Sequence, residues 1–492
     1  MVKFILNNET IGSDLPAGTT VLDFVRYHKN LKGTKIGCRE GDCGACTILV
    51  GEINDDSIKY RSMTSCLMPL ANADGKHIVT VEGINKPNNE LTEVQRAMVD
   101  ESGTQCGFCT VGFVMSLTGF CLDETEKSCE MAISSIDGNI CRCTGYKSIE
   151  RAAESLTKVL NSTNGESRLA FAVEKGIVPE YFSNIRERIR NLKSQILDNE
   201  DQRLTTKERK PNSQFIGGGT DLYVQRREEL VYASAENLFD DADLRFIEET
   251  NEFIEVGASV TVTDLLVSPV MQKLFPNLYK HLKLVSSTPI RNMATLAGNF
   301  VNASPIGDMT AWFLALDAEI ILQGNLGDNE NKSGNLRVSK GAERAISLKD
   351  FFLGYKQLAK TDDEFIAKIR FRKDFSHFNF EKVCKRTFLD IASVNTAISL
   401  KVESNSIIES HVSAGGVAPI PLYLRKTSEF LRGKEISAET ISQANEILQT
   451  EISPISDVRG SADYKRLLLK QLFMAHFVEL FNYQFSDKET KL

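Results

Sequence analysis

The sequence predicts a multidomain α+β protein, and three observations carry this prediction. At 492 residues the chain exceeds what one ordinary hydrophobic core accommodates, so three or four domains are expected. Apolar residues alternate at 2 to 6, as in a half-buried strand, whereas residues 91 to 160 follow a helical period. A polar, charge-rich stretch then separates this part from a second series of strands and helices that reaches residue 481.

Strand and helix signals follow one another in a typical order at the start of the chain. The strand at 2 to 6 precedes a helix that Thr19 or Thr20 can cap and that directs Leu22, Val25 and Tyr27 toward a core. After a cysteine-rich loop, residues 47 to 50 and 57 to 61 flank a turn-rich insert, as the two strands of a hairpin do. This order predicts a ferredoxin-like β-grasp domain over residues 1 to 82.

Periodicity and composition indicate the remaining boundaries. Residues 83 to 163 predict a domain of four helices, the last of which buries a face that includes Ile149 and Leu156. Residues 164 to 212 are expected to form a solvated linker with one short amphipathic helix. Residues 213 to 376 form the next predicted domain. Residues 377 to 492 predict a C-terminal α+β domain with helices between Ser437 and Phe481.

Eight of the eleven cysteines form two sets of four within the first 143 residues. The first set is Cys38, Cys43, Cys46 and Cys66, and its C-x4-C-x2-C run is the plant-type 2Fe-2S signature. The second set is Cys106, Cys109, Cys141 and Cys143, in a C-x2-C and a C-x-C pair. Because four thiolates complete one 2Fe-2S cluster, the spacing predicts two clusters and therefore electron transfer.

Two alternatives compete with iron-sulfur clusters. A disulfide framework is disfavoured, because the N-terminus lacks a signal peptide and the interior of a cell is reducing. Zinc is the second alternative, since C-x2-C pairs also occur in zinc ribbons. Gly37, Gly41 and Gly44 between the first thiols favour a bulky cluster there, whereas the second set alone leaves zinc and iron open. The remaining Cys121, Cys129 and Cys384 have no such spacing and are expected to be buried structural thiols.

A run of three glycines, Gly217 to Gly219, follows a strand-like segment at 214 to 216. Consecutive glycines let backbone N–H groups approach a phosphate closely, although a plain turn explains the run equally well. A second glycine-containing stretch at 287 to 308 strengthens the nucleotide interpretation, because two such loops could clamp a pyrophosphate. The sequence has no G-x-G-x-x-G, so this nucleotide would bind in a fold other than the Rossmann fold.

Composition and missing motifs exclude several classes of function. The net charge of -8 gives no reason to expect a nucleic-acid partner. No apolar run approaches the roughly 18 residues that cross a bilayer, so a soluble, cytoplasmic protein without a membrane partner is expected. The six histidines fall in no ligand or triad pattern, and neither G-x-S-x-G nor H-E-x-x-H occurs. We therefore expect no catalytic side chain in this chain, with the chemistry left to cofactors.

Longer motifs carry a resemblance to a known family. GCREGDCGACTILV, QCGFCTVGF and GNICRCTGY, in this order, resemble the paired 2Fe-2S domains of the molybdenum hydroxylase family, which includes xanthine dehydrogenases and aldehyde oxidases. FIGGGTDL and TLAGNFVNASPIGD resemble that family's FAD domain, and AGGVAPIP its C-terminal flavin-associated domain. The resemblance covers nearly the whole chain apart from the linker. It implies an FAD-binding domain of the molybdopterin dehydrogenase (PCMH-like) type, followed by an α+β flavin-associated domain.

The resemblance also implies which residues bind each cofactor. The two cysteine sets would each bind one 2Fe-2S cluster. Gln105 resembles the family residue that approaches the pterin of the molybdenum cofactor, and Val111 departs from the family's usual proline. FAD binding is implied for Phe215, Ile216, Gly217, Gly218, Gly219, Thr220, Asp221, Leu222, Thr295, Leu296, Ala297, Gly298, Asn299 and Asp308, and less directly for Val285, Ile366 and Lys382.

The function that the resemblance implies is electron transfer within a xanthine dehydrogenase. The family's molybdopterin domain, which hydroxylates hypoxanthine and xanthine in purine catabolism, has no counterpart in these 492 residues. The expected partner is therefore a large molybdopterin-binding subunit, in a heterotetramer of two small and two large subunits, with NAD taking electrons from FAD. Three alternatives remain open: the same role in an aldehyde, N-heteroaromatic or carbon monoxide hydroxylase, a stand-alone iron-sulfur flavin reductase, and a zinc-stabilised interaction protein.

Overall fold

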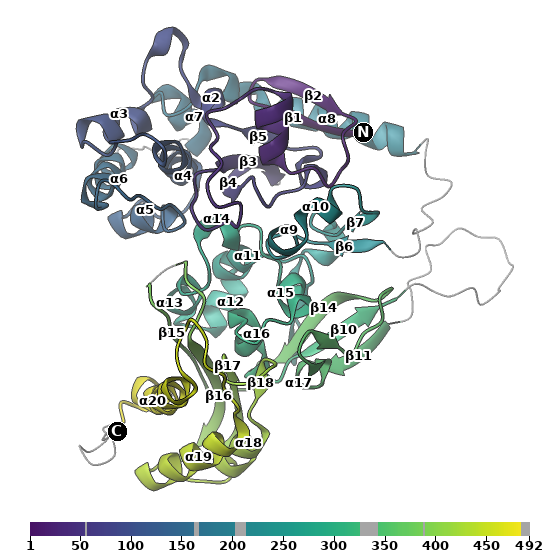
Figure 1. The fold of residues 1–492 in the computed structure, drawn as a ribbon, viewed down its shortest axis with the longest axis vertical. Helices are drawn as coiled ribbons and strands as arrows, with labels where there is room; N and C mark the ends of the chain where they lie inside the picture. Colours follow the sequence, from purple (N-terminus) through teal and green to yellow (C-terminus); the bar gives the residue numbers. More distant parts are fainter. Residues whose placement is uncertain (55–56, 162–166, 202–212, 325–342, 387–388, 484–492) are drawn as a thin grey trace, which may run out of the picture. The chain divides into compact units, whose positions relative to one another are not determined.

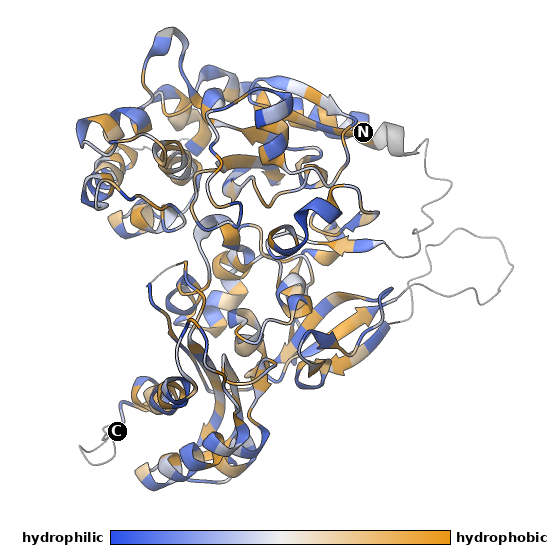
Figure 2. Cartoon of the chain, viewed as in Figure 1, coloured by the Kyte–Doolittle hydropathy of each residue, from blue (hydrophilic) through white to orange (hydrophobic). Residues whose placement is uncertain are grey.

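The computed structural model describes residues 1–54, 57–161, 167–201, 213–324, 343–386 and 389–483 (Figure 1). The chain forms two compact units. The first unit contains residues 1–239 and 287–294, and the second contains residues 240–286 and 295–492. In both units hydrophobic residues concentrate on the strands and on one side of the helices (Figure 2). No helix in the described ranges combines the length and the apolar character that crossing a membrane requires.

A five-stranded sheet opens the first unit, in the order β2-β1-β5-β3-β4. β1 and β5 are parallel, and the other neighbours are antiparallel. The strands are β1 (Val2–Leu6), β2 (Glu9–Ser13), β3 (Thr47–Asn54), β4 (Ser57–Thr64) and β5 (His77–Val79). This topology confirms the predicted ferredoxin-like β-grasp fold, and β3 and β4 form the predicted hairpin.

The helix that crosses this sheet departs from the prediction at one residue. Thr20 caps α1 (Val21–Asp23), which continues into the π-helical turn η1 (Phe24–His28). Leu22 and Val25 are buried as predicted, but Tyr27 is 65% exposed. The wider π-helical turn, in which the Lys29 N–H donates to the Phe24 carbonyl, turns Tyr27 away from the core.

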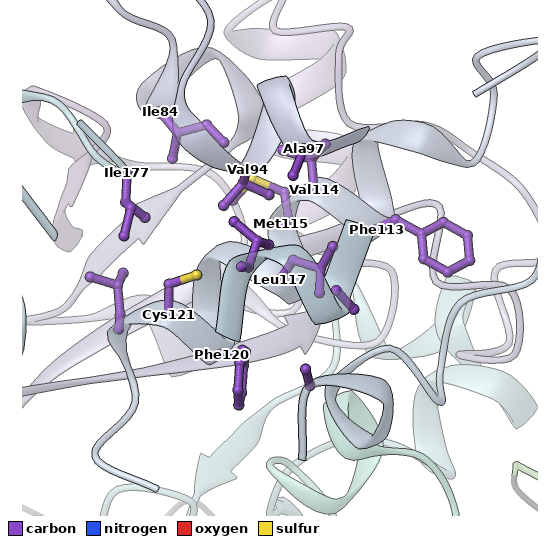
Figure 3. Close-up of a cluster of buried hydrophobic side chains, with 14 of the residues drawn as sticks. Ile84, Val94, Ala97, Phe113, Val114, Met115, Leu117, Phe120, Cys121 and Ile177 are labelled. Carbon is purple, nitrogen blue, oxygen red and sulfur yellow. The ribbon is translucent and has the colours of Figure 1, made fainter. Parts of the chain in front are cut away.

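Four helices form the second domain of the first unit, as predicted. They are α3 (Glu93–Asp100), α4 (Thr110–Leu122), α5 (Cys129–Ser135) and α6 (Lys147–Leu160), and the short α2 (Val81–Ile84) precedes them. α4 is buried on nearly every side, and its Phe113, Val114 and Leu117 share a core with Val94 of α3 (Figure 3). The predicted face of α6 is buried as expected.

The predicted linker after this domain contains the amphipathic helix that was expected, but the prediction that it is solvated was wrong for its described part. Residues 168–201 form α7 (Arg168–Glu174), the 3-10 turn η4 (Glu180–Asn184) and α8 (Ile185–Asp201). Phe171 and Phe182 enter the core of the four-helix domain, and Ile189 packs with Ile5 of β1. Because α8 has many charged residues on its outer side, the composition of this stretch suggested a solvated linker even though one side of the helix is apolar. Residues 164–166 and 202–212 of the predicted linker lie outside the described residues.

The domain predicted over residues 213 to 376 is divided between the two units. In the first unit β6 (Gln214–Ile216) pairs in parallel with β7 (Ala235–Asn237), and α9 (Leu222–Gln225) and α10 (Arg227–Leu230) lie between them in the sequence. Tyr223 and Leu230 share a core with Leu67 of the β-grasp domain. The short α14 (Thr288–Arg291) also belongs to this unit.

The second unit contains two antiparallel sheets. One has the order β11-β10-β14-β9-β8, and the other has the order β15-β16-β17-β18. The strands of the first sheet are β8 (Ile247–Glu249), β9 (Phe253–Gly257), β10 (Glu319–Gln323), β11 (Glu343–Ser347) and β14 (Phe365–Arg372), and β12 (Phe352–Gly354) and β13 (Gln357–Leu358) form a separate pair. Helices α11 (Val262–Val267), α12 (Pro269–Leu274), α13 (Leu278–Lys283), α15 (Leu296–Asn302), α16 (Asp308–Leu314) and α17 (Leu348–Phe351) belong to the same region.

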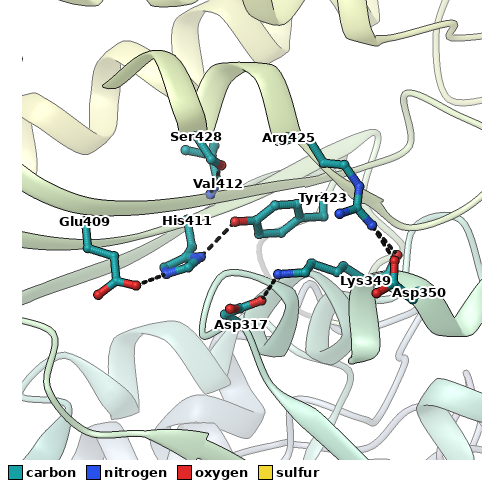
Figure 4. Close-up of polar contacts among 9 residues, drawn as sticks. All are labelled: Asp317, Lys349, Asp350, Glu409, His411, Val412, Tyr423, Arg425 and Ser428. Carbon is teal, nitrogen blue, oxygen red and sulfur yellow. Dashed lines mark hydrogen bonds and ion pairs between the residues drawn. The ribbon is translucent and has the colours of Figure 1, made fainter. Parts of the chain in front are cut away.

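The C-terminal sheet and its helices confirm the predicted α+β domain. The strands are β15 (His377–Val383), β16 (Val394–Glu403), β17 (Ser406–Gly415) and β18 (Leu422–Tyr423). The helices are α18 (Arg425–Leu431), α19 (Ala438–Glu451) and α20 (Ala462–Phe481). Figure 4 shows polar contacts at β17 and β18. The Tyr423 hydroxyl lies 2.7 Å from His411 Nδ1, and Arg425 forms an ion pair with Asp350 of α17.

Three buried histidines make stability depend on pH. Burial lowers the pKa of His77 to about 3, of His281 to about 4 and of His476 to about 3. A histidine that must stay neutral in the folded chain binds fewer protons than in the unfolded chain, so its stabilising effect is present above pH 6.5 and is lost as pH falls toward the folded pKa.

We therefore expect the free energy of unfolding to fall below pH 6.5 by about 1.4 kcal/mol per pH unit for each such histidine. Urea unfolding of wild type and His77→Gln at several pH values between 7 and 5 measures this slope. The variant should have the shallower pH dependence, and His28→Gln, at an exposed position, should leave the slope unchanged. Equal slopes in wild type and His77→Gln would contradict the expectation.

Candidate cofactor sites

The first cysteine set lies on the loop before β3 and just after β4. Its thiols form two close pairs, Cys38 with Cys43 and Cys46 with Cys66. Gly41 and Gly44 have φ of 80° and 67°, a backbone conformation that glycine adopts without strain, and so the loop can fold around the sulfur atoms.

Backbone N–H groups point at these sulfur atoms. The N–H of Glu40 donates to Cys38 Sγ at 3.3 Å, and the N–H of Cys38 donates to Cys43 Sγ at 3.4 Å. Hydrogen bonding to the Cys43 thiol and to the backbone N–H groups of Glu40, Cys43 and Asp42 outweighs burial and lowers the pKa of Cys38 to about 5. The thiolate form, which is the form that binds a metal, is thus favoured at Cys38, whereas the same pairing raises the pKa of its partner Cys43.

The second cysteine set lies at the amino ends of α4 and α6. Cys106 Sγ lies 3.6 Å from Cys143 Sγ, and Cys109 interacts with Cys141. Cys141 Sγ has Thr144 as its neighbour, with the Thr144 hydroxyl at 3.1 Å and the Thr144 N–H at 3.4 Å. Burial raises the pKa of Cys141, but these hydrogen bonds outweigh it and leave the pKa lowered.

The pairing of the thiols bears on which metal group fits. Each set divides into two pairs of interacting thiols, and a 2Fe-2S cluster has two irons that each take two protein thiolates. All eleven cysteines are free thiols. The donor sets therefore fit binuclear clusters.

The two cysteine loops are joined directly. The N–H of Ile140, next to Cys141, donates to the carbonyl of Cys43 at 3.1 Å. The Asn139 side-chain amide donates to the carbonyl of Gly44 at 3.2 Å. The first of these bonds thus connects a cysteine of the first set to the residue before a cysteine of the second set.

Close packing against other parts of the backbone requires glycine at two positions of the run Gly217 to Gly219, which the sequence did not indicate. A Cβ on Gly218 would lie 1.7 Å from the Met293 carbonyl oxygen, and a Cβ on Gly219 would lie 2.7 Å from the Leu67 carbonyl oxygen. Gly219 also has φ of 83°. In the described part of the chain, the N–H groups of Gly217 to Thr220 donate to no protein acceptor, which fits a loop that binds an anionic group.

Most of the other FAD candidates lie together in the second unit. Thr295 caps α15, and Asn299 Oδ1 accepts hydrogen bonds from the N–H and hydroxyl of Thr310 in α16. At the start of α16, Asp308 pairs with Lys382 Nζ at 2.7 Å. Lys382 Nζ also donates to the carbonyl of Leu284, beside Val285. Thr295 to Asn299, Asp308, Lys382 and Val285 are therefore linked through adjacent contacts.

Two residues of the second unit differ from the sequence prediction of the FAD site. Ile366 is buried within β14 at 1% exposure, where its register partner is Leu322 of β10. Asn395 was not a candidate, yet its amide donates to Asp308 Oδ1 at 2.6 Å, and its buried Oδ1 has no partner among the described residues. An unpartnered buried acceptor fits a site that binds a ligand with N–H groups. No sequence motif marks Asn395.

The three leftover cysteines differ from one another. Cys121 is buried as predicted, but Cys129 is exposed and Cys384 is partly exposed. Burial raises the pKa of Cys121 to about 12. The prediction of buried structural thiols was therefore right for Cys121 and wrong for the other two.

Four family models match the chain in succession. They are the 2Fe-2S iron-sulfur cluster binding domain at residues 4–71, the [2Fe-2S] binding domain at 80–154, the FAD binding domain in molybdopterin dehydrogenase at 195–371 and the CO dehydrogenase flavoprotein C-terminal domain at 380–480. These matches confirm the predicted domain types, which are two 2Fe-2S domains, an FAD-binding domain and a flavin-associated C-terminal domain. In this order the matched domains are similar to the iron-sulfur and FAD-binding portion of molybdenum hydroxylases.

Whole-chain similarity extends to proteins named xanthine dehydrogenase. The chain is 29% identical to that of Emericella nidulans over 89% of this chain and 35% of the relative. It is 28% identical to that of Blastobotrys adeninivorans over 94% and 39%, and 26% identical to xanthine dehydrogenase 1 of Arabidopsis thaliana over 94% and 38%. The chain thus spans little more than a third of the length of these relatives.

Two solved structures are also similar in part. Quinoline 2-oxidoreductase of Pseudomonas putida 86 is 24% identical, with a TM-score of 0.48 over 55% of this chain and 90% of that chain. Carbon monoxide dehydrogenase of Hydrogenophaga pseudoflava is 23% identical, with a TM-score of 0.49 over 56% and 91%.

Proposed function

We propose that this chain carries electrons in a xanthine dehydrogenase, from a molybdopterin-binding partner subunit that hydroxylates hypoxanthine and xanthine to FAD and then NAD. The observation that carries this proposal is the arrangement of two thiol quartets, each divided into two pairs, with two hydrogen bonds between their loops. The similarity to xanthine dehydrogenases over nearly the whole chain supports the choice of substrate.

The chain's own residues would bind the cofactors and tune them. The two cysteine sets would each hold a 2Fe-2S cluster, with backbone N–H groups directed at the sulfur atoms. The proposed FAD residues are 215 to 222 in the first unit and Val285, Thr295 to Asn299, Asp308, Ile366 and Lys382 in the second. When bound, the clusters accept one electron each and FAD exchanges two. The proposal includes the boundaries 1–82, 83–163, 213–376 and 377–492, a cytoplasmic location and a heterotetramer with two partner subunits.

Cofactor content and substrate choice test this proposal together. The purified complex is expected to be brown, with about four irons and one FAD per chain. It should form urate from xanthine with NAD as acceptor, and benzaldehyde, quinoline and carbon monoxide should be poorer substrates by at least about tenfold in kcat/KM. Zinc in place of iron would contradict the cluster assignment. Preference for another substrate would contradict the assignment of xanthine as substrate. NAD reduction by xanthine without a molybdopterin-binding partner would contradict the proposal that the partner subunit carries out the hydroxylation.

A further inference from the structure

Residues 287–294, here called the bridging segment, belong to a different unit from the residues before and after them in the sequence. Residues 240–286 before the segment and 295–492 after it belong to the second unit, whereas the segment itself packs within the first. It contains α14, with Pro289 in the first turn of this helix. A stretch of the flavin-domain sequence is thus built into the iron-sulfur unit.

One side of the bridging segment holds the β-grasp domain next to its cysteines. Asn292 Nδ2 donates to the Ser62 carbonyl at 2.8 Å, four residues before Cys66. Ile290 lies against Gly41, where a Cβ would come within 2.7 Å of Ile290 Cδ1. Gly41 stands between Cys38 and Cys43, so the segment contacts both stretches that carry the first cysteine set.

The other side holds the four-helix domain next to its own cysteines. Arg291 Nη2 lies 2.6 Å from Asp137 Oδ2, and the N–H of Thr288 donates to Asp137 Oδ1 at 2.7 Å. The Thr288 hydroxyl donates to the Ser134 carbonyl at 3.0 Å. Asp137 lies four residues before Cys141. Both carboxylate oxygens are therefore committed to the bridging segment.

The Arg291–Asp137 pair is the most deeply buried contact of this set. The side chains are 3% and 1% exposed, whereas Arg151 and Glu101, another ion pair in the same unit, are 56% and 34% exposed. A buried pair with additional hydrogen bonds has a fixed geometry, and removing one partner leaves an uncompensated charge. An exposed pair contributes little by comparison.

These contacts lie on either side of the two hydrogen bonds that join the cysteine loops. Asp137 is followed by Gly138, on which a Cβ would lie 2.8 Å from Pro289, and then by Asn139 and Ile140, which donate to the first cysteine loop. The bridging segment therefore fixes the chain on both sides of those bonds.

We propose that the bridging segment, fastened by Arg291 and Asp137, is a positioning element that sets the distance and orientation between the two cysteine quartets. This inference rests on the proposed function only in that the quartets hold redox clusters. Its contacts involve no cofactor. Arg291 and Asp137 act through the cysteine loops and touch no reacting atom.

The full chain with its cofactors is the material for the test. Arg291→Met is compared with wild type, with Arg291→Lys, which keeps the charge, and with Arg151→Met as the matched exposed control. Two quantities are measured. One is hydrogen exchange of the backbone over residues 137 to 141. The other is the magnetic interaction between the two reduced clusters, which depends steeply on their separation.

Arg291→Met should exchange at least about tenfold faster over residues 137 to 141, since it breaks a buried pair. It should also show an altered magnetic interaction at unchanged iron content. In both measurements Arg291→Lys should be closer to wild type than Arg291→Met is. Arg151→Met should give the same values as wild type. Should Arg291→Met fail to accumulate, the double variant Arg291→Met/Asp137→Asn, which leaves no lone charge, takes its place.

Unchanged exchange and unchanged magnetic interaction in the variant would overturn the proposal. The exchange measurement requires no cluster, so it decides the positioning role even if wild type lacks iron. Missing iron or missing xanthine activity in wild type would contradict the proposed function alone.

Discussion

Replacing Cys43 by serine is expected to remove the first cluster and leave the second cluster and FAD in place. Cys43 is paired with Cys38, and a serine hydroxyl is a far poorer ligand than a thiolate for an iron-sulfur centre. Iron should fall to about two atoms per chain, and one of two electron paramagnetic resonance signals should disappear. Electron delivery to the acceptor should fall by more than about 100-fold, since changes around a metal ligand already cost 10- to 100-fold.

The matched control for this variant is Cys129→Ser. Cys129 is exposed, belongs to neither quartet and begins α5. Its replacement should leave iron, flavin and both resonance signals unchanged. Simultaneous loss of both signals in Cys43→Ser would mean that the two quartets do not bind independent clusters, and unchanged iron would mean that Cys43 is not a ligand.

Local patterns in the sequence predicted the elements that depend on neighbouring residues. Alternation located β1, the helical period located α4 and α6, and short cysteine spacings located the quartets. Each of these features is fixed by residues within a few positions of one another, so a reading along the chain can detect it.

Features that depend on distant partners escaped the sequence reading. Arg291 and Asp137 are 154 positions apart in the sequence, and neither belongs to a motif from which the ion pair could be predicted. Asn395 reaches Asp308 over 87 positions. Gly218 and Gly219 looked like a phosphate loop, and the backbone carbonyls that they also accommodate come from Met293 and Leu67. The burial of residues 168 to 201 was missed for another reason: charged residues dominate the composition there, while Phe171, Phe182 and Ile189 are buried.

Replacing Lys382 by methionine is expected to destabilise the second unit and to weaken FAD binding, by two separable routes. The Lys382 side chain is fully buried, and Asp308 is 12% exposed, so the variant leaves a carboxylate without its cation. Breaking a buried pair on one side costs about 3 kcal/mol or more. The double variant Lys382→Met/Asp308→Asn removes both charges and should recover most of that stability.

FAD affinity distinguishes the two routes. If Asp308 and Lys382 contact the flavin, the double variant should regain stability yet still bind FAD at least about tenfold more weakly than wild type. Urea unfolding and titration of the apoprotein by flavin fluorescence measure the two effects. Lys401→Met is the matched control, because the exposed Lys401–Asp374 pair, at 3.6 Å, should contribute less than about 1 kcal/mol. Full recovery of FAD binding in the double variant would restrict the pair to a structural role, and the assignment of Asp308 and Lys382 to the flavin site would then be wrong.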